Sequence, residues 1–402
     1  MSFNDAFAGY RWSYFSSLTD EALRSRGQIF IDSTIWKALT EYATTVRGGK
    51  GCIILPDIGL GFNHMVRIIE FDGNVQWVAR LRMQSLSRNR DGSKKAESVM
   101  KLEHSMILLV KEHTNIPVPQ VHAIELDPAC GVNAQFMLMD CLKGNAGIDF
   151  GMKIPSTHKN YVMYRMAEIQ APYSYVQLPK IGAILHRNED GSFEQGPIPG
   201  IGGPFETAAE FFKAWAANVE FGLSKDRLKE AAGSLADELS SSADSFRSSV
   251  GSLAESLSVR NTGPFPLHHG DFGHNNMIFD DEYKLLGVID WEAAFAGPWE
   301  ISSEFPLTLS IVPPAMDAPW NYDDKGHPND AGDIQKFADR EVYIAMVAEK
   351  EREMGLIEGY RLSTALQDRN RQYLATAMRL YQRGKPGWYA KVVERLSQGS
   401  TS

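Results

Sequence analysis

Residues 268–292 constrain the fold more than any other stretch of the sequence. They read HHGDFGHNNMIFDDEYKLLGVIDWE, which is a polar loop, an apolar run, an acidic turn and a second apolar run that ends at Asp290. Two short apolar runs joined by such a turn predict a β-hairpin. Because a hairpin brings its open ends together, we expect Asn276 and Asp290 to lie close to each other, with Asp271 just before them.

The residue types at these positions predict phosphate chemistry. An amide oxygen and a carboxylate are hard ligands suited to Mg²⁺ that carries phosphate, so Asn276 and Asp290 are the candidate metal ligands. Asp271 is placed to accept a hydroxyl proton, and its five-residue spacing selects Asn276 over Asn275. Each residue alone would be an ordinary turn residue. It is the combination that makes Asp271, Asn276 and Asp290 candidate catalytic residues.

The pattern His-Gly-Asp-x-x-x-x-Asn followed by Ile-Asp-Trp-Glu resembles the aminoglycoside phosphotransferase and choline kinase-like family, in the form common in filamentous fungi. The resemblance implies an α+β, bilobal, protein-kinase-like fold, with an antiparallel sheet and one helix in the N-lobe and a larger, mostly helical C-lobe. It also implies Mg²⁺-dependent transfer of a γ-phosphoryl group to a hydroxyl of a small molecule. ATP is the expected donor, with GTP as the alternative.

The first third of the chain should then form the nucleotide-binding lobe. Strands are predicted over 64–71 and 75–82, because Asp-Gly between two alternating apolar runs is a strong hairpin signal. The segment GLGFNHMV at 59–66 matches G-x-G-x-x-G-x-V except at His64, and VARL at 78–81 falls where V-A-I-K belongs. The resemblance assigns nucleotide binding to these positions: Gly59, Gly61, Val66 and Arg80.

The helix predicted over 93–112 supplies Glu103, which the resemblance makes the ion-pair partner of Arg80. Arg82 and Glu97 are the reserve pair. Alternatively, the two glycines only permit a tight turn, and the Arg80 pair is an ordinary surface contact.

Strands are predicted over 121–125 and 135–139. The segment FMLMDCL at 136–142 resembles the family's link between the lobes. There the main chain of Met137 to Cys141, including Met139, is expected to pair with adenine.

The chain is expected to divide into an N-terminal helical extension (1–50), a nucleotide-binding lobe and hinge (51–144), a helical lobe with the catalytic loop and substrate site (145–390) and a tail (391–402). In the helical lobe a hairpin is predicted over 181–198. The apolar spacing predicts helices over 158–170, 207–222, 226–258, 333–354 and 361–383.

Composition sets the limits on partners. Of the 402 residues, 41 are basic and 50 acidic, which gives a net charge of −9 and argues against general nucleic-acid binding. A small-molecule acceptor is expected, and a cationic one is an option. No apolar run approaches the ~18 residues of a membrane span. Three cysteines without a C-x-x-C pair and a start without a signal-peptide pattern favour a reducing, cytoplasmic location.

One alternative is a non-catalytic, kinase-like nucleotide-binding module, because His64 and Arg80 depart from the family pattern. A protein kinase is disfavoured, since no D-F-G or A-P-E pattern follows Asp290. His269, Trp291 and Trp299 are expected to be structural. The acidic residues of the proline-rich stretch beyond the hairpin either lie in a solvated loop or face a cationic acceptor: Asp317, Asp323 and Asp324.

Overall fold

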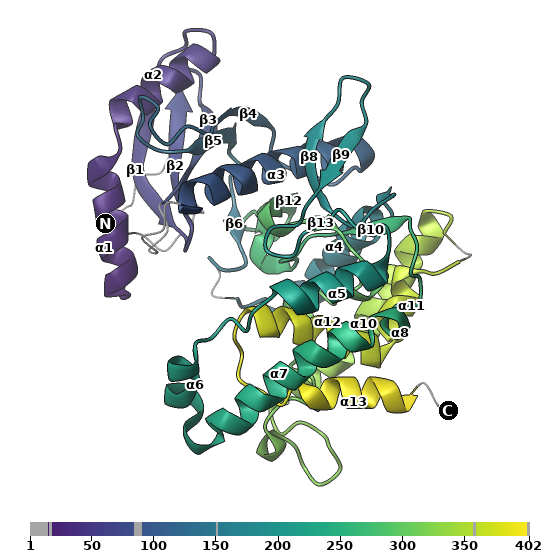
Figure 1. The fold of residues 1–402 in the computed structure, drawn as a ribbon. Coiled ribbons are helices and arrows are strands. Elements are labelled where there is room, and N and C mark those ends of the chain that lie inside the picture. Colours follow the sequence, from purple (N-terminus) through teal and green to yellow (C-terminus); the bar gives the residue numbers. More distant parts are fainter. Residues whose placement is uncertain (1–14, 16–17, 84–90, 150–151, 357–358, 400–402) are drawn as a thin grey trace. The chain divides into compact units, whose positions relative to one another are not determined.

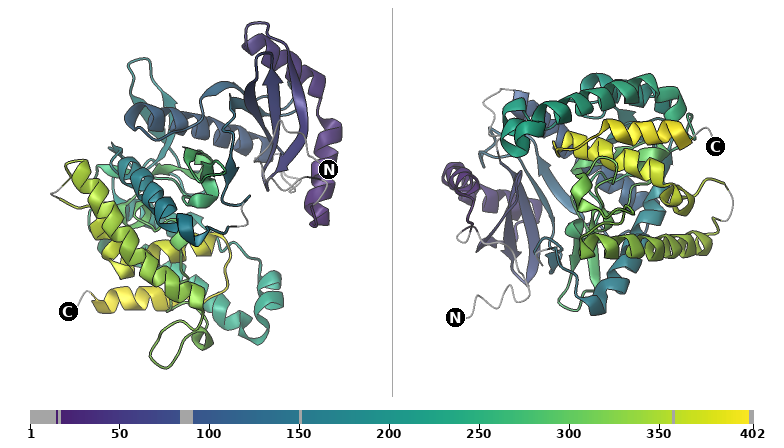
Figure 2. Two further views of the ribbon diagram at one scale, coloured as in Figure 1. Left: turned by 180° about the vertical axis from the view of Figure 1, so that it is seen from behind. Right: turned by 90° about the horizontal axis from the view of Figure 1, so that it is seen from below.

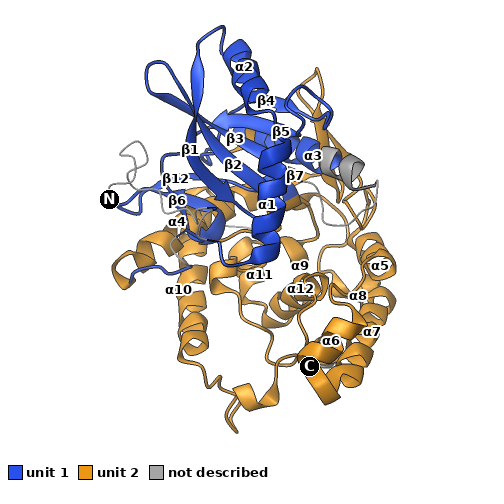
Figure 3. Ribbon diagram, turned by 90° about the vertical axis from the view of Figure 1, so that its left-hand side faces the viewer, with its two compact units in different colours: residues 1–111, 115–155, 274–292 blue, residues 112–114, 156–273, 293–402 orange. Residues whose placement is uncertain are grey.

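The computed structural model describes residues 15, 18–83, 91–149, 152–356 and 359–399. Two compact units make up the chain (Figure 3). Unit 1 contains residues 1–111, 115–155 and 274–292, and unit 2 contains residues 112–114, 156–273 and 293–402. The hairpin with Asn276 and Asp290 therefore belongs to unit 1, although it follows most of unit 2 in the sequence. The predicted functional boundaries at 50, 144 and 390 remain predictions.

Unit 1 is built on a five-stranded antiparallel sheet with the order β1-β2-β3-β5-β4 (Figure 1). Its strands are β1 (Cys52–Leu60), β2 (His64–Phe71), β3 (Val75–Arg82), β4 (Val121–Glu125) and β5 (Phe136–Asp140). Its helices are α1 (Glu21–Ser33), α2 (Trp36–Val46) and α3 (Asp91–His113). The predicted hairpin at 64–82 is confirmed residue for residue. The helix predicted over 93–112 is present as α3 and begins two residues earlier, and residues 84–90 lie outside the described residues.

The pleat of β3 decides which side chains reach each face of this sheet. Ala79 and Leu81 join the core cluster that α1 and α2 complete, and these helices run along the strands in Figure 2. Val78 belongs to a second cluster, with Met100 of α3. Successive residues of a strand face opposite sides. Arg80 therefore shares the face of Val78, which is the face that α3 covers.

A second, three-stranded sheet completes unit 1. Its order is β12-β11-β6, with β6 (Asn145–Ala146), β11 (Met277–Phe279) and β12 (Leu285–Val288). The predicted hairpin at the strongest motif is thus confirmed, with Met277 paired to Val288. A short 3-10 helix, His274–Asn276, leads into β11.

Unit 2 is mostly helical, as predicted. Its α-helices are α4 (Ser156–Ser174), α5 (Ala208–Asn218), α6 (Lys225–Ala232), α7 (Ala236–Ser252), α8 (Ala254–Leu257), α9 (Trp299–Ser302), α10 (Ala331–Glu353), α11 (Leu362–Gln367), α12 (Arg369–Gln382) and α13 (Ala390–Gly399). Its strands are β7 (Gln177–Leu178), β8 (Ala183–Arg187), β9 (Phe193–Gly196), β10 (Phe265–His268) and β13 (Phe295–Ala296). The β8–β9 hairpin confirms the one predicted at 181–198.

Two predicted helices are broken in the structure. The helix expected over 226–258 is interrupted at Gly233, whose positive φ of 55° ends α6, and again between α7 and α8. The helix expected over 361–383 is divided at Asp368, whose carboxylate accepts from the Arg371 N–H at 3.2 Å and caps α12. Apolar periodicity runs across both breaks because all the pieces bury the same side.

The segment predicted as a tail contains α13. Val392 and Val393 on this helix are buried, and α13 contacts α7. In the described part of the chain, no helix is both long and apolar enough to cross a membrane.

Candidate active site

Four of the predicted nucleotide-binding residues form one row across the sheet of unit 1. Gly59 pairs with Val66, Val66 with Arg80, and Arg80 with Met137. Directly paired residues in antiparallel strands project to the same face. The row begins with a residue that has no side chain, which leaves the space above Val66 and Arg80 open.

The glycine-rich segment is a tight turn between β1 and β2. The Gly61 N–H donates to the His64 carbonyl at 2.9 Å, and Phe62 at the tip is 74% exposed. Arg26 of α1 supports the turn: its Nη1 donates to the Phe62 carbonyl at 2.6 Å and its Nη2 to the Met83 carbonyl at 3.3 Å. Arg26 therefore ties α1 to the tip of this turn and to the residue that follows β3.

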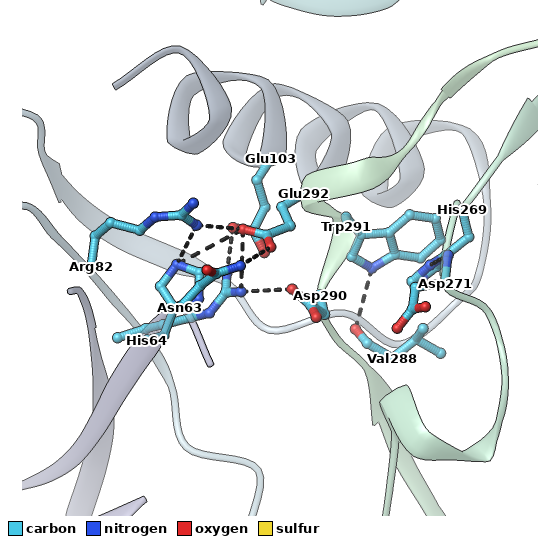
Figure 4. Close-up of polar contacts among 11 residues, drawn as sticks. Asn63, His64, Arg82, Glu103, His269, Asp271, Val288, Asp290, Trp291 and Glu292 are labelled. Carbon is cyan, nitrogen blue, oxygen red and sulfur yellow. Dashed lines mark hydrogen bonds and ion pairs between the residues drawn. The ribbon is translucent and has the colours of Figure 1, made fainter. Parts of the chain in front are cut away.

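Arg80 binds two carboxylates, those of Glu103 and Asp290, and both of these residues are labelled in Figure 4. Its Nη1 donates to Glu103 and its Nη2 donates to Asp290 Oδ1 at 2.6 Å. The predicted Arg80–Glu103 ion pair is present. Burial opposes the charge of Arg80, but Glu103, Asp290 and Glu292 outweigh it and raise the pKa of the guanidinium. Burial raises the pKa of Glu103 to about 7 against the attraction of Arg80, and the carboxylates of Asp290 and Glu292 add to the rise.

Glu292, which follows the β11–β12 hairpin, connects it with the glycine turn. Its Oε2 accepts from Arg82 Nη1 at 2.7 Å, and its Oε1 accepts from Asn63 Nδ2 at 3.4 Å. Arg82 Nη1 also lies 3.2 Å from His64 Nε2. Burial, with the nearby charges of Arg80, Arg82 and Arg26, lowers the pKa of His64 well below its usual range. The ring is neutral at pH 7, so Nε2 can accept from Arg82.

Asn276 and Asp290 line one cavity from the two ends of the β11–β12 hairpin. The Ile289 N–H donates to the Asn276 carbonyl at 2.9 Å and holds the ends together. The sequence suggested that Asp290 ends the second strand, but β12 stops at Val288. Asp290 follows in a left-handed conformation with a φ of 66°. Aspartate tolerates this conformation better than most residues. The turn directs its carboxylate to Arg80 and the cavity.

The donor set fits a phosphate-bound Mg²⁺. Asp290 Oδ2 has no partner among the described residues, since the contact to Arg80 uses Oδ1. No group of three or more His, Cys, Asp or Glu side chains suited to a metal occurs in the described ranges. Magnesium typically takes one or two protein ligands and completes its shell with phosphate and water. Asn276 and Asp290 match that requirement.

The cavity of unit 1 has a volume of about 410 Å³. The charged side chains of Arg80, Glu103, Asp290 and Glu292 form one part of its lining, and apolar side chains form another. The apolar members include Val66, Val78, Ile107, Met139, Leu142, Ala146, Ile148, Ile278 and Ile289. An apolar slot beside a charged cluster can hold a purine base and its phosphates together.

The adenine contact predicted for the Met137 main chain gains no support from the sheet pairing. Met137 lies inside the sheet, paired with Arg80 on one side and Ile124 on the other, so its main-chain groups serve the sheet. The described cavity-lining residues include Met139 and Asp140 but neither Met137 nor Cys141. The strand extends to Asp140, and the Asp140 and Cys141 N–H groups donate to the Gln120 and Gln76 carbonyls at 3.0 and 3.4 Å.

Asp271 belongs to unit 2, in the loop after β10. The neighbouring Gly270 has φ 82°, and a Cβ there would lie 2.5 Å from the Ala293 carbonyl oxygen, so the position requires glycine. His269 is fully buried, and its Nδ1 accepts from the Asp271 N–H at 3.4 Å. His269 is therefore structural, as predicted. The Asp271 carboxylate accepts from Arg383 Nη2, and Arg383 follows α12 directly.

Several contacts were not predicted. Glu292 stands two residues after Asp290, and Arg82 alternates with Arg80, so the motif spacing could have indicated both. Glu97, the reserve partner, lies in α3, but its side chain is outside the described residues. Trp291 and Trp299 are buried core residues, as predicted. No sequence signal connects Arg26 with the glycine turn or Arg383 with Asp271, because each pair is joined only by tertiary packing.

Comparison with protein families shows which family this chain belongs to. A model described as the phosphotransferase enzyme family matches residues 69–300, more than half of the chain. The chain belongs to this family. It is an ATP-dependent phosphotransferase that acts on a hydroxyl acceptor, and the predicted enzyme class is confirmed.

Two solved structures similar to this phosphotransferase come from bacteria. A crystal structure from Ralstonia eutropha JMP134, provisionally assigned as an aminoglycoside phosphotransferase, aligns over 86% of both chains with a TM-score of 0.51 and 14% identity. The macrolide 2'-phosphotransferase MphH of Brachybacterium faecium aligns over 90% of this chain and 93% of its own, with a TM-score of 0.44 and 14% identity. The first likeness confirms the predicted α+β, kinase-like fold class.

A curated relative of the phosphotransferase is much longer. The chain is 24% identical over 197 residues to an Arabidopsis thaliana protein named probable acyl-CoA dehydrogenase IBR3. The match includes 48% of this chain and 21% of that protein, so it spans about a fifth of the relative's length. The dehydrogenase name therefore describes far more than the matched segment.

Proposed function

We propose that this phosphotransferase moves the γ-phosphoryl group of ATP, with Mg²⁺, to the hydroxyl of a small molecule, and that Asp271 is the base. One observation carries the nucleotide half: Asn276, Asp290, Arg80 and Glu103 line a single cavity of unit 1 together with the glycine turn. Phosphoryl transfer needs a cationic side chain for the phosphates, hard oxygen ligands for Mg²⁺ and an apolar slot for the base.

The apolar side of the cavity is the proposed base site. Val66, Val78 and Met139 would contact the purine faces. The main chain at the end of β5, where Met139 and Asp140 line the cavity, is the proposed adenine partner. The glycine turn at 61–63 would cover the phosphates, and Arg80 would neutralise α- and β-phosphate charge while Glu103 holds its guanidinium in place.

Asn276 and Asp290 would hold Mg²⁺ against the phosphates through an amide oxygen and a carboxylate. When bound, the ion neutralises charge that develops on the transferred group. Arg80 already contacts Asp290, so the same side chain would fix the ligand carboxylate and face the phosphates.

Asp271 would orient the acceptor hydroxyl and take its proton. The hydroxyl oxygen forms a bond to the γ-phosphorus as the bond to the β–γ bridging oxygen breaks, which leaves ADP. The buried His269 and the constrained Gly270 fix the loop that presents this carboxylate.

The test is ADP formation and mass-spectrometric detection of a phosphorylated product, with Mg·ATP and a pooled metabolite extract. We expect turnover by the native chain and none by Asp271→Asn, which should still bind Mg·AMP-PNP. Undiminished turnover by Asp271→Asn contradicts the base assignment. Tight Mg·ATP binding without ADP formation for any acceptor favours the non-catalytic module instead.

A further inference from the structure

The ion pair between Asp271 and Arg383 places a cation beside the proposed base. Both residues belong to unit 2, and Arg383 Nη2 donates to Asp271 Oδ1. The side chain of Arg383 is 50% exposed and that of Asp271 is 28% exposed. Arg383 lies beyond residue 300, where the family match ends.

Arg379, one helical turn earlier, binds two partners within the protein. Its Nε donates to Glu304 at 2.8 Å and its Nη2 to Ser310 Oγ at 2.6 Å, and its side chain is only 12% exposed. Arg383, in contrast, makes its one ion pair within the described ranges with Asp271. A guanidinium carries five N–H donors, so Arg383 retains donors for a ligand.

We propose that the acceptor carries a carboxylate close to the hydroxyl that is phosphorylated, and that Arg383 binds this carboxylate. This inference rests on the proposed function of Asp271. The hydroxyl must lie within ~3 Å of the Asp271 carboxylate, and Arg383 holds the other side of that carboxylate. An anionic group two or three bonds from the hydroxyl therefore falls within reach of the guanidinium, whose fork matches a carboxylate.

The same geometry disfavours a cationic acceptor. An ammonium group near the reacting hydroxyl would lie beside the guanidinium and be repelled. In the transfer, the hydroxyl proton goes to Asp271, the hydroxyl oxygen bonds to the γ-phosphorus, the bond to the bridging oxygen breaks, and ADP leaves. The carboxylate on Arg383 takes no part in bond making and only positions the hydroxyl.

Three acceptors of nearly equal size test the proposal: 3-hydroxybutyrate, its neutral amide and 4-amino-2-butanol. Longer 3-hydroxy acids extend the carboxylate series, and glycerol 3-phosphate tests a phosphate in place of the carboxylate. The native chain should favour the hydroxy acids at least tenfold in kcat/KM over the amide, and the amino alcohol should be poorest. Preference for glycerol 3-phosphate or for the amino alcohol overturns the carboxylate assignment.

Variants separate binding from positioning. Arg383→Gln should raise KM for the hydroxy acids about tenfold with little change in kcat. The same variant should leave the KM for the amide unchanged. Arg383→Lys should recover part of the lost affinity for the hydroxy acids. Lys385→Gln, at an exposed neighbouring position, is the matched control and should behave as the native chain. An equal fall in kcat for charged and neutral acceptors would show that Arg383 only positions Asp271, and would overturn the proposal.

A binding measurement completes the test if turnover of these probes is slow. Hydroxy acids at saturating concentration, with Mg·AMP-PNP present, should raise the melting temperature of the native chain and not that of Arg383→Gln. Equal shifts in both overturn the proposal. Failure of the proposed function would give a different result, because no ADP would then form with an acceptor of any charge.

Discussion

Arg80 Nη2 donates to Asp290 Oδ1 at 2.6 Å and so joins the central sheet of unit 1 to the proposed metal-ligand hairpin. The second nitrogen of the same guanidinium donates to Glu103 on α3. One side chain thereby fixes three elements that are far apart in the sequence. This explains why an arginine can replace the expected lysine: its planar fork serves two carboxylates at once.

Arg80→Ala should weaken nucleotide binding. A charge-assisted hydrogen bond is worth about 1.5–3 kcal/mol, so we expect the Kd for Mg·AMP-PNP to rise about 10- to 100-fold. Arg80→Lys keeps the charge and loses the planar guanidinium, so its Kd for Mg·AMP-PNP should lie between those of the native chain and Arg80→Ala. Calorimetric titration measures both, and native-like affinity of Arg80→Ala would remove the phosphate role.

Arg26→Ala should loosen the glycine turn. The substitution removes the hydrogen bonds to the Phe62 and Met83 carbonyls, each worth about 1 kcal/mol. Nucleotide affinity should fall a few-fold while the fold is kept. Arg24→Ala, at an exposed position of the same helix, is the control and should bind as the native chain. Equal affinities of the two variants would show that α1 does not support the turn.

Strand pattern and turn residues predicted the hairpin at 64–82 and the hairpin that carries Asn276 and Asp290. Both succeed because period-2 alternation and short turns are local signals. The ion pair of Arg80 with Glu103 came from the family resemblance. The position of Met137 inside the sheet was not predicted, because the sequence does not show that β4 pairs on the far side of β5. Gly233 and Asp368 divided helices whose apolar stripe continues unbroken. The tertiary partners Arg26 and Arg383 leave no trace in local sequence.

Gly270→Ala should reduce phosphotransfer strongly. The added Cβ would meet the Ala293 carbonyl at 2.5 Å in a left-handed backbone, and the loop that carries Asp271 would have to shift. Gly326→Ala is the matched control, because its φ is 79° and nothing lies within 4 Å of the added Cβ. We expect kcat to fall at least about tenfold in Gly270→Ala only. Steady-state kinetics of both variants measures kcat. An equal fall in kcat in the two variants would show that backbone strain alone causes the effect.

His64 and Glu103 should affect the pH dependence of stability in opposite directions. The pKa of His64 is lowered on folding, so the unfolded chain binds more protons below pH ~6.5 and stability falls as pH falls. The pKa of Glu103 is raised to about 7, so the folded chain binds more protons between its unfolded value and pH 7, and stability rises as pH falls through that window.

Thermal unfolding at about pH 8 and about pH 5.5 separates these two contributions. Relative to the native chain, His64→Gln should lose less stability on acidification and Glu103→Gln should lose more. The same sign of change in both variants would contradict the assigned pKa directions.

The most direct test of the central claim is the Mg²⁺ dependence of AMP-PNP binding, measured by calorimetry in the native chain and in Asp290→Asn. The account predicts that Mg²⁺ strengthens binding to the native chain at least about tenfold and has little effect on binding to Asp290→Asn. Asp271→Asn, measured alongside, should respond to Mg²⁺ as the native chain does. An undiminished Mg²⁺ effect in Asp290→Asn would contradict the assignment of this carboxylate as the metal ligand.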